Sequence, residues 1–228
     1  MRKVIVSFLK KIGFSGLESL PSDLVIPYAR ERAIILLRGI LRFRKFCFLG
    51  KGVEIKCKRK IIMGRFVTIH TYTYIDACSE KGIILEDYCT IGKHNYERSG
   101  YLNNPSGYLV MKKNSSTNYG CFIGATGGII IGKNVLIGPK VTIISESHIF
   151  DSLEDPIKAQ GVKNFPVEIA NDVWTGTNTT ILGGVRIGEH SIIGAYSLVN
   201  KNVSPYQIVV GIPAKSLKNR EDESSHIS

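Results

Sequence analysis

The sequence predicts an all-β solenoid, in which the chain winds as a parallel β-helix of hexapeptide repeats with an N-terminal helical segment, projecting loops and a short C-terminal extension. The main observation is an aliphatic residue, or a threonine, at every sixth position over long stretches. A period of six contains three strand repeats of two, so such a residue can point inward once on each face of a triangular coil. Three hexapeptides then close one turn. The longest runs are Ile131, Ile137 and Ile143, followed by Ile169, Thr175, Ile181, Ile187, Ile193 and Val199.

Glycine often follows the repeated residue, which is the second observation. Gly138, Gly176 and Gly188 are examples, and glycine suits a corner where a Cβ would clash. Repeats of this period are typical of parallel β-helices. The alternative, a β-sandwich, would show turn signals about every 8 to 12 residues, and these are absent from the sequence.

Residues 1–48 are predicted to form a basic, helical segment in which Asp23 caps the helix and Pro27 lies near its first turn. Residues 1–65 hold 16 Lys and Arg against 4 Asp and Glu, a balance of +12, whereas residues 66–228 hold 14 against 15, a balance of −1. Arginines interrupt the apolar face of this helix. It either packs on the coil with solvated arginines or contacts a membrane surface. No motif for reading nucleic acid accompanies the charge.

The coil is expected over residues 49–203, with loops at 93–108 and 150–166, because the register of the hexads slips there. Residues 204–228 are expected to form a C-terminal extension with a disordered tail. Before the longest run, the hexads continue only over short stretches. These are Met63, Ile69 and Ile75, then Leu85 and Ile91, then Met111, Thr117 and Ile123.

The sequence favours a cytoplasmic protein, free or peripheral at the inner face of the membrane. Neither a secretory signal nor a run of about 18 uncharged apolar residues is recognisable. The five cysteines form no CxxC pair, so we expect reduced, packed thiols. They lie at Cys47, Cys57, Cys78, Cys89 and Cys121.

The segments NVLIGPKVTIISESHIF, NDVWTG, GVRIG, IIGAYSLVNK and GIPAK resemble the bacterial hexapeptide-repeat acyltransferases. Within that family the chain is most similar to the sugar O-acetyltransferases of surface-polysaccharide biosynthesis, in which a loop carrying PI and QG pairs follows the histidine. Here these are Pro156-Ile157 and Gln160-Gly161. The resemblance implies a left-handed coil, acetyl-CoA as donor, no metal, and a homotrimer with active sites between neighbouring chains. Thr175 departs from the usual Ile, so its buried hydroxyl should need a backbone partner.

His148 matches the catalytic base of this family, and an imidazole suits proton removal from an attacking hydroxyl. The hexad register makes Ile149 the next inward residue, so His148 is expected to face outward into a cleft. The alternative is an ordinary surface histidine. Glu146 or, preferably, a backbone carbonyl would orient the ring, since alternate strand residues are about 7 Å apart.

Asn118 lies 30 residues before His148 and matches an Asn that contacts the acceptor in similar sugar acetyltransferases. Its amide could bind acceptor oxygens or the developing oxyanion, or Asn118 could simply occupy a corner of the coil. Asp151 or Glu154 could read sugar hydroxyls, although solvated loop carboxylates are the simpler interpretation.

The resemblance also implies a set of residues on the CoA side. Trp174 matches an aromatic lining of the acceptor or pantetheine channel, with a core Trp as the alternative. Thr177 and Ala195 match positions along the pantetheine arm. Lys201, Lys215 and Lys218 match basic positions that contact CoA phosphates, as their charge allows; ordinary solvated lysines are the alternative.

The function predicted from these residues is acetyl-CoA-dependent O-acetylation of a sugar or polysaccharide precursor by direct transfer. Acetylation of another small acceptor, such as an amino sugar, serine or a xenobiotic, is the main alternative. A zinc-dependent carbonic anhydrase-like β-helix is disfavoured because His70, His94 and His190 fall in unrelated registers. A non-catalytic scaffold is disfavoured because His148 and the CoA-side residues occur together.

Overall fold

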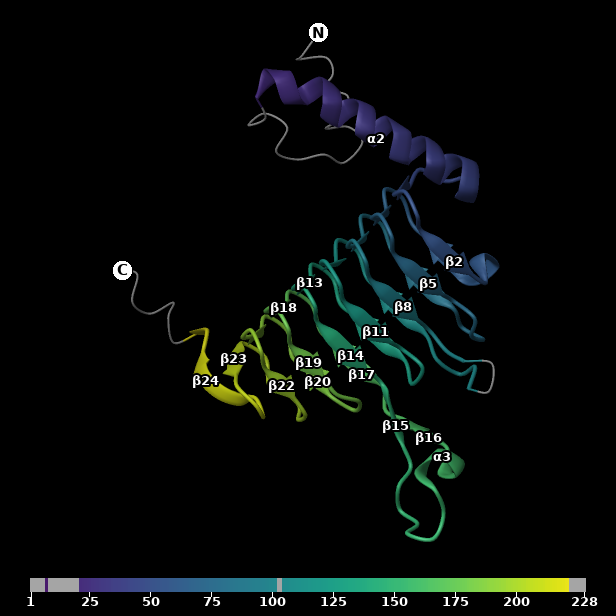
Figure 1. Cartoon of the computed structure of the whole chain (residues 1–228). Helices are drawn as coiled ribbons and strands as arrows, with labels where there is room; N and C mark the ends of the chain where they lie inside the picture. The colour runs from purple at the N-terminus through teal and green to yellow at the C-terminus, as the bar shows by residue number, and fades with distance from the viewer. Residues whose placement is uncertain (1–6, 8–20, 102–103, 222–228) are drawn as a thin grey trace.

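A computed structural model describes residues 7, 21–101 and 104–221. The chain forms a left-handed parallel β-helix of about seven coils, with one long helix across its first coil and one arm projecting from its side (Figure 1). Each coil adds a strand to three sheets, here called faces A, B and C, and the corners are named by the faces they join. Helix α2 spans Ser22–Phe43.

Face A has nine strands: β1 (Phe48–Leu49), β4 (Thr68–Ile69), β7 (Thr90–Ile91), β10 (Ser116–Thr117), β13 (Leu136–Ile137), β18 (Trp174–Thr175), β21 (Ile192–Ile193), β23 (Gln207–Val210) and β24 (Lys215–Asn219). Face B has seven: β2 (Glu54–Lys56), β5 (Tyr74–Asp76), β8 (Tyr96–Arg98), β11 (Phe122–Gly124), β14 (Thr142–Ile144), β19 (Thr180–Ile181) and β22 (Leu198–Val199). Face C has six: β3 (Ile61–Met63), β6 (Ile83–Leu85), β9 (Leu109–Met111), β12 (Ile129–Ile131), β17 (Val167–Ile169) and β20 (Arg186–Ile187). A 3-10 helix, η2, covers Lys58–Lys60.

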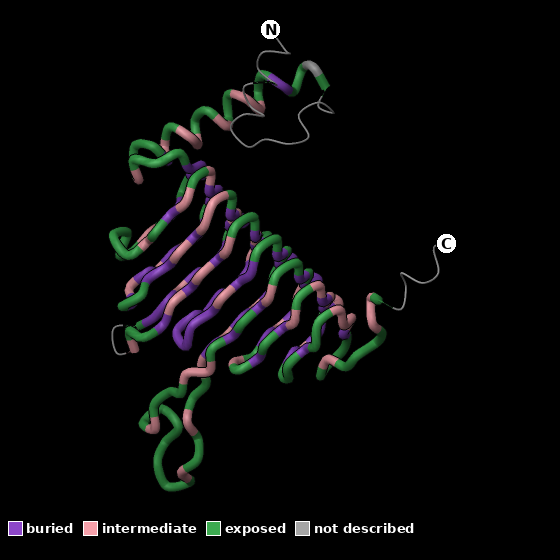
Figure 2. Tube along the Cα trace, turned by 180° about the vertical axis from the view of Figure 1, so that it is seen from behind, coloured by how far each residue is buried: buried purple, intermediate pink, exposed green. Residues whose placement is uncertain are grey.

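Every residue in the hexad runs from Met63 to Val199 is buried, so the period of six identified the core of the coil correctly. Figure 2 shows these residues as a buried band along the axis of the coil. Thr175 is fully buried and its hydroxyl oxygen accepts a hydrogen bond from the Gly138 N–H at 3.3 Å. This is the backbone partner that the sequence required.

The corner glycines are explained by the close approach of successive coils. A Cβ on Gly138 would lie 2.5 Å from the Thr175 carbonyl oxygen, and one on Gly188 would lie 2.3 Å from the Pro205 nitrogen. Neither glycine has a positive φ. The left-handed corner positions are instead held by residues such as Lys140 and Tyr196, so the glycines provide space rather than conformational freedom.

One section of the core is polar. Glu97 is fully buried on β8, at a position where face B otherwise carries Ile or Val. Its Oε1 accepts a long hydrogen bond from Asn95 Nδ2 at 3.4 Å, while Oε2 has no partner in the described structure. Burial raises the pKa of Glu97 to about 8, although hydrogen bonds from Asn95 and Thr117 oppose the shift. The carboxyl group is therefore largely protonated at neutral pH.

Helix α2 docks through a glycine. A Cβ on Gly39 would lie 1.8 Å from the carbonyl oxygen of Cys47, so only glycine lets the helix reach the first coil. The guanidinium of Arg32 lies 4.7 Å from the centre of the Phe48 ring. The helix begins after Pro21, and Asp23 lies in its first turn, so the expectation that Asp23 is the cap was wrong. The rest of the segment, residues 1–20 apart from Ser7, lies outside the described residues.

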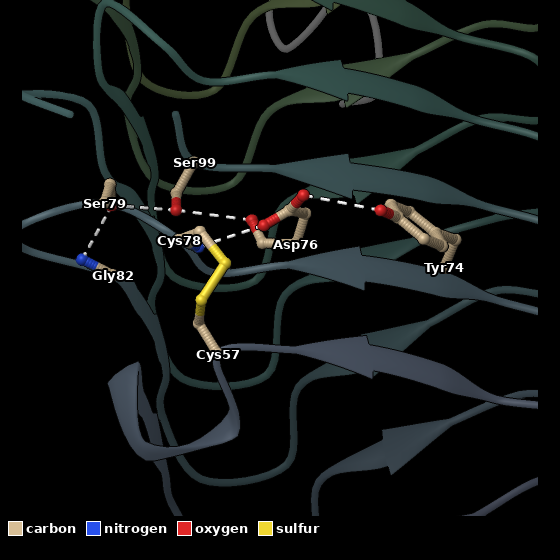
Figure 3. Close-up of a disulfide and its surroundings, with 7 residues drawn as sticks. All are labelled: Cys57, Tyr74, Asp76, Cys78, Ser79, Gly82 and Ser99. Atoms are coloured by element: carbon tan, nitrogen blue, oxygen red, sulfur yellow. Dashed lines mark hydrogen bonds between the residues drawn. A yellow bond between two sulfur atoms is a disulfide. The ribbon is translucent and has the colours of Figure 1, made fainter. Parts of the chain in front are cut away.

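The prediction of five reduced cysteines was wrong for two of them. Cys57 and Cys78 form a disulfide that joins the first and second coils at the corner between faces B and C (Figure 3). They are 21 residues apart, about one coil, which places them side by side. Cys47, Cys89 and Cys121 are free and buried, as expected.

Two expected boundaries also differ from the structure. The predicted loop at 93–108 contains strand β8, so only the residues after Arg98 leave the coil. The predicted extension at 204–228 contains β23, which pairs parallel with β21 and continues face A, and β24, which folds back antiparallel on β23. Residues 222–228, the predicted tail, are outside the described part of the chain.

The buried Glu97 predicts an unusual dependence of stability on pH. The carboxyl group has its ordinary pKa of 4.5 in the unfolded chain, whereas the folded group keeps its proton up to about pH 8. The contribution of Glu97 to the stability of the folded protein is therefore lost as the pH rises from 4.5 to about 8. Glu97→Gln keeps a neutral hydrogen-bonding group, so it should be more stable than the wild type by about 1 kcal/mol at pH 5 and by about 4 kcal/mol at pH 8.

Urea unfolding followed by circular dichroism at both values of pH measures this difference. Glu168→Gln is the matched control, because Glu168 is exposed on face C and its replacement should leave the pH dependence unchanged. Equal pH dependence in the wild type and Glu97→Gln would show that Glu97 is ionised in the folded protein.

Candidate active site at the base of a projecting arm

The chain leaves the coil at Ser145, and this residue fixes the base of the arm. Its hydroxyl donates to the Gly124 carbonyl oxygen at 2.8 Å and accepts from the Gly127 N–H at 2.9 Å. Its carbonyl oxygen accepts from the N–H of Phe165, where the chain returns, at 2.7 Å. A Cβ on Gly127 would lie 1.8 Å from the same carbonyl oxygen. Gly127 thus makes room for the exit of the arm.

His148 lies on the arm, not on a strand of the coil. Strands β15 (Glu146–His148) and β16 (Val162–Asn164) form an antiparallel pair in which His148 faces Val162. The reasoning that placed Ile149 at an inward position of the coil was wrong, because the hexad register ends at Ser145. The expected loop at 150–166 likewise contains helix α3 (Ile157–Gln160) and strand β16.

An open cavity of about 580 Å³ lies beside this arm. It is lined by His148 together with Ile144, Phe165 and Leu182. His148 is exposed, and its ring makes no hydrogen bond to any residue that the structure describes. The cavity walls are largely apolar, and His148 and Glu146 are the ionisable residues in the lining.

Glu146 does not orient the His148 ring in the structure. Its Oε1 lies 3.7 Å from Nη2 of Arg98, and both side chains are largely buried, at 15% and 13% exposed. The Arg98 guanidinium in turn lies 3.6 Å from the centre of the Tyr101 ring. Glu146 therefore ties the arm to face B. A backbone carbonyl bonded to the ring is also absent among the described residues, so neither expected partner of His148 is present.

The side chain of Gln160, the first residue of the QG pair, holds the tip of the arm together. Its Nε2 donates to the carbonyl oxygens of Ser152 and Asp155 at 3.0 and 2.9 Å, and its Oε1 accepts from the Ser152 N–H at 3.0 Å. Three bonds from one side chain close the tip of the arm. Asp151 and Glu154 are solvent-exposed on this tip.

Asn118 lies at a different corner from His148. It follows β10 at the corner between faces A and B, whereas the arm leaves the corner between faces B and C. Its Oδ1 accepts the N–H of Tyr119 at 2.7 Å, and its Nδ2 has no partner among the described residues. The amide is thus anchored through its oxygen and keeps two N–H groups for a ligand.

A second hollow of about 300 Å³ surrounds Asn118, with His70 and Lys93 in its lining. Burial lowers the pKa of His70, and the charges of Arg32 and Lys93 lower it further. This hollow is separate from the cavity beside His148, so one chain does not bring Asn118 and His148 together.

The predicted CoA-side residues form two groups, with Lys201 apart from both. Trp174, 52% exposed on β18, is not a core residue. Thr177 and Ala195 follow it at the corner between faces A and B, where the Thr177 hydroxyl donates to the Pro139 carbonyl oxygen at 3.0 Å. Lys215 and Lys218 lie on β24 at the end of face A. Lys201 is separate, at the corner between faces B and C.

One group of possible metal ligands occurs in the described residues. Donor atoms of Cys57, Asp76 and Cys78 lie within 4.8 Å of one another. Their sulfur atoms are bonded to each other, however, and Asp76 Oδ1 accepts the Cys78 N–H at 3.1 Å (Figure 3). Metal ligation requires thiolates, so this set does not fit a metal while the disulfide is intact.

Four residues beside the candidate site residues were not identified from the sequence. Arg98 pairs with Glu146. Phe165 and Leu182 line the cavity beside His148, and His70 lies beside Asn118. Arg98, Leu182 and His70 come from other coils, so their positions depend on how coils stack across loops of different length, whereas Phe165 lies where the arm returns to its own coil. A spacing of about two coils from a known site residue is the signal that could have found His70 and Arg98.

Comparison with known proteins agrees with this architecture. Residues 166–201 match the family model described as bacterial transferase hexapeptide (six repeats). The chain is 29% identical over 147 residues to the galactoside O-acetyltransferase of Escherichia coli (strain K12), covering 64% of this chain and 71% of that protein. It is 28% identical over 125 residues to the putative lipopolysaccharide biosynthesis O-acetyl transferase WbbJ of the same strain, covering 52% of this chain and 64% of that protein.

Among solved structures, the N-acyltransferase AntD from Bacillus cereus, in complex with dTDP and 3-hydroxybutyryl-CoA, matches with a TM-score of 0.52 at 17% identity, covering 84% of this chain and 92% of that one. At that identity the similarity shows the fold alone. The chain spans about half the length of several other curated acetyltransferases that it matches. With the repeats, the three-faced coil and these relatives taken together, the chain is similar to the bacterial hexapeptide-repeat acyltransferases.

Proposed function

We propose that the protein transfers acetyl from acetyl-CoA to a hydroxyl of a sugar or glycan precursor, with His148 as general base. The observation that carries this proposal is the position of His148, exposed beside an apolar cavity of about 580 Å³ with its ring free of partners in the described structure. The sugar acceptor is supported by the two O-acetyltransferase relatives, whose names specify a galactoside and lipopolysaccharide biosynthesis.

The chemistry assigned to this site is direct transfer. The acceptor hydroxyl gives its proton to the His148 imidazole while its oxygen attacks the thioester carbonyl carbon. The C–S bond then breaks, and the imidazolium returns the proton to the departing thiolate. An acyl-enzyme is disfavoured because the Ser147 hydroxyl is directed to the His148 carbonyl oxygen at 3.4 Å and the three free cysteines are buried.

The donor is proposed to lie along face A and its corner with face B. Thr177 and Ala195 would face the pantetheine arm, where small side chains allow close approach, with Trp174 beside it. Lys215 and Lys218 would meet the phosphates at the end of this path. Lys201 is at another corner, so it would contact CoA bound mainly by a neighbouring chain.

Two chains are proposed to form each active site. Asn118 lies at one corner of the coil and the arm with His148 leaves from another, so a site using both must combine Asn118 of one chain with His148 of the next. The cyclic homotrimer implied by the family satisfies this requirement at three identical interfaces. The Asn118 Nδ2, which has no partner among the described residues, would donate to the acceptor or to the oxyanion.

Replacing His148 tests the proposed base. His148→Ala should lower kcat at saturating acceptor by roughly 10²- to 10⁴-fold, because the general base is removed. His190→Ala is the control, since His190 pairs with Asp172 at the corner between faces C and A and should keep near wild-type kcat. Mass spectrometry of acetylated products measures the rate. Near wild-type turnover by His148→Ala would exclude His148 as the base.

Mixing two inactive variants tests the shared site. His148→Ala and Asn118→Ala should each be impaired, and trimers refolded from equal amounts of both should regain activity. About one quarter of the interfaces would then combine an intact His148 with an intact Asn118 from the neighbour. Separately refolded variants, mixed only afterwards, are the control. If activity did not rise in the mixed trimers, Asn118 and His148 would act within the same chain, or Asn118 would not belong to the site.

A further inference from the structure

Helix α2 has two opposite faces that differ in burial. One stripe follows i, i+3 and i+4 spacing through Val25, Tyr28, Arg32, Leu36, Gly39 and Phe43, all buried or half-buried. The other stripe follows the same spacing on the opposite side and is exposed throughout: Ile26, Arg30, Ala33, Ile34, Leu37 and Leu41. Since Gly39 of the first stripe touches Cys47 of the coil, the second stripe faces away from the coil.

This outward stripe is apolar along the length of the helix. Leu37 and Leu41 are 56% and 74% exposed, and Ile26 is 60% exposed. Figure 2 shows exposed residues from one end of α2 to the other. An exposed apolar stripe of this size is typical of an interaction surface. It lies on a helix whose docking to the coil is already provided by the opposite face.

The cations around the stripe are free to bind anions. The guanidinium groups of Arg30, Arg38 and Arg44 make no hydrogen bond or ion pair with any other residue in the described structure. Arg30 lies within the apolar stripe, where its aliphatic stem can be buried while its charged end reaches water or a phosphate.

The positive charge of residues 21–65 favours an anionic partner for the outward stripe. Residues 21–65 contain 12 Lys and Arg against 3 Asp and Glu, a balance of +9. Two copies of such a surface would repel each other, whereas an anionic lipid surface attracts it by about 1 kcal/mol for each cation near the surface. None of the helices in the described residues is long and apolar enough to cross a membrane, so the stripe suits a helix lying in the plane of the interface.

We propose that α2 binds an anionic lipid membrane through its outward stripe, with Ile26, Ile34, Leu37 and Leu41 in the acyl boundary and Arg30 and Arg38 on lipid phosphates. The helix thus has a double role. Its inner stripe closes the first coil, and its outer stripe holds the coil at the membrane. This inference is independent of the proposed reaction, because it concerns the opposite end of the coil from β24 and needs no activity.

Vesicle sedimentation of the full-length protein tests the proposal. The wild type should bind vesicles of phosphatidylcholine with 30% phosphatidylglycerol, and bind pure phosphatidylcholine more weakly. Leu37→Glu with Leu41→Glu should bind the anionic vesicles about a hundredfold more weakly, because two apolar side chains are lost from the interface. Arg38→Gln, which keeps the helix, should bind them about fivefold more weakly.

Leu153→Glu is the matched control, because Leu153 is fully exposed at the tip of the arm and its replacement should leave vesicle binding unchanged. Circular dichroism of each variant confirms that the coil is folded. If the variant with both Leu37→Glu and Leu41→Glu bound anionic vesicles as tightly as the wild type, the proposal would be overturned. A change in molar mass by light scattering, with vesicle binding unchanged, would assign the stripe to a contact between chains.

Discussion

The structure depends on the close stacking of successive coils. Strands of adjacent coils are about 4.8 Å apart, and their parallel hydrogen bonds leave no room for a side chain at the tight corners. Gly138 and Gly188 satisfy this constraint, since a Cβ on either would meet backbone of the next coil within 2.5 Å. The same stacking aligns Cys57 with Cys78 and Tyr74 with Tyr96. Residues about one coil apart in sequence therefore become neighbours in space.

The candidate site exists because the stacking is interrupted at one corner. Ser145 keeps its place in the coil through bonds to Gly124 and Gly127, and Phe165 resumes the coil beside it. The arm between them is stabilised locally by the hairpin and by the three bonds of Gln160. Because the arm lies outside the coil, His148 is free of the packing that buries Ile143. The proposed general base is thus presented without weakening the core.

The period of six was sufficient to predict the coil and its buried residues, because an inward position recurs wherever the hexads continue without a break. It failed where the backbone departs from the repeat. The position of His148 on β15 depends on where the chain leaves the coil, which Ser145 and two glycines decide. The disulfide depends on a coil length that varies with the loops. Glu97 lies inside a segment whose register had slipped, so the sequence offered no sign that a carboxyl group replaces an aliphatic residue in the core.

The coil also sets the distance between its two proposed functional regions. Helix α2 crosses the first coil, and the arm with His148 leaves the fifth (Figure 1). Four coil spacings separate them, or about 20 Å along the axis. A solenoid packed by buried aliphatic residues is stiff, so this separation would stay constant if α2 binds a membrane as proposed. With α2 on a membrane, a lipid-linked acceptor must extend past the first coils before a hydroxyl reaches His148. The number of coils between α2 and the arm would then select which part of a growing glycan is acetylated.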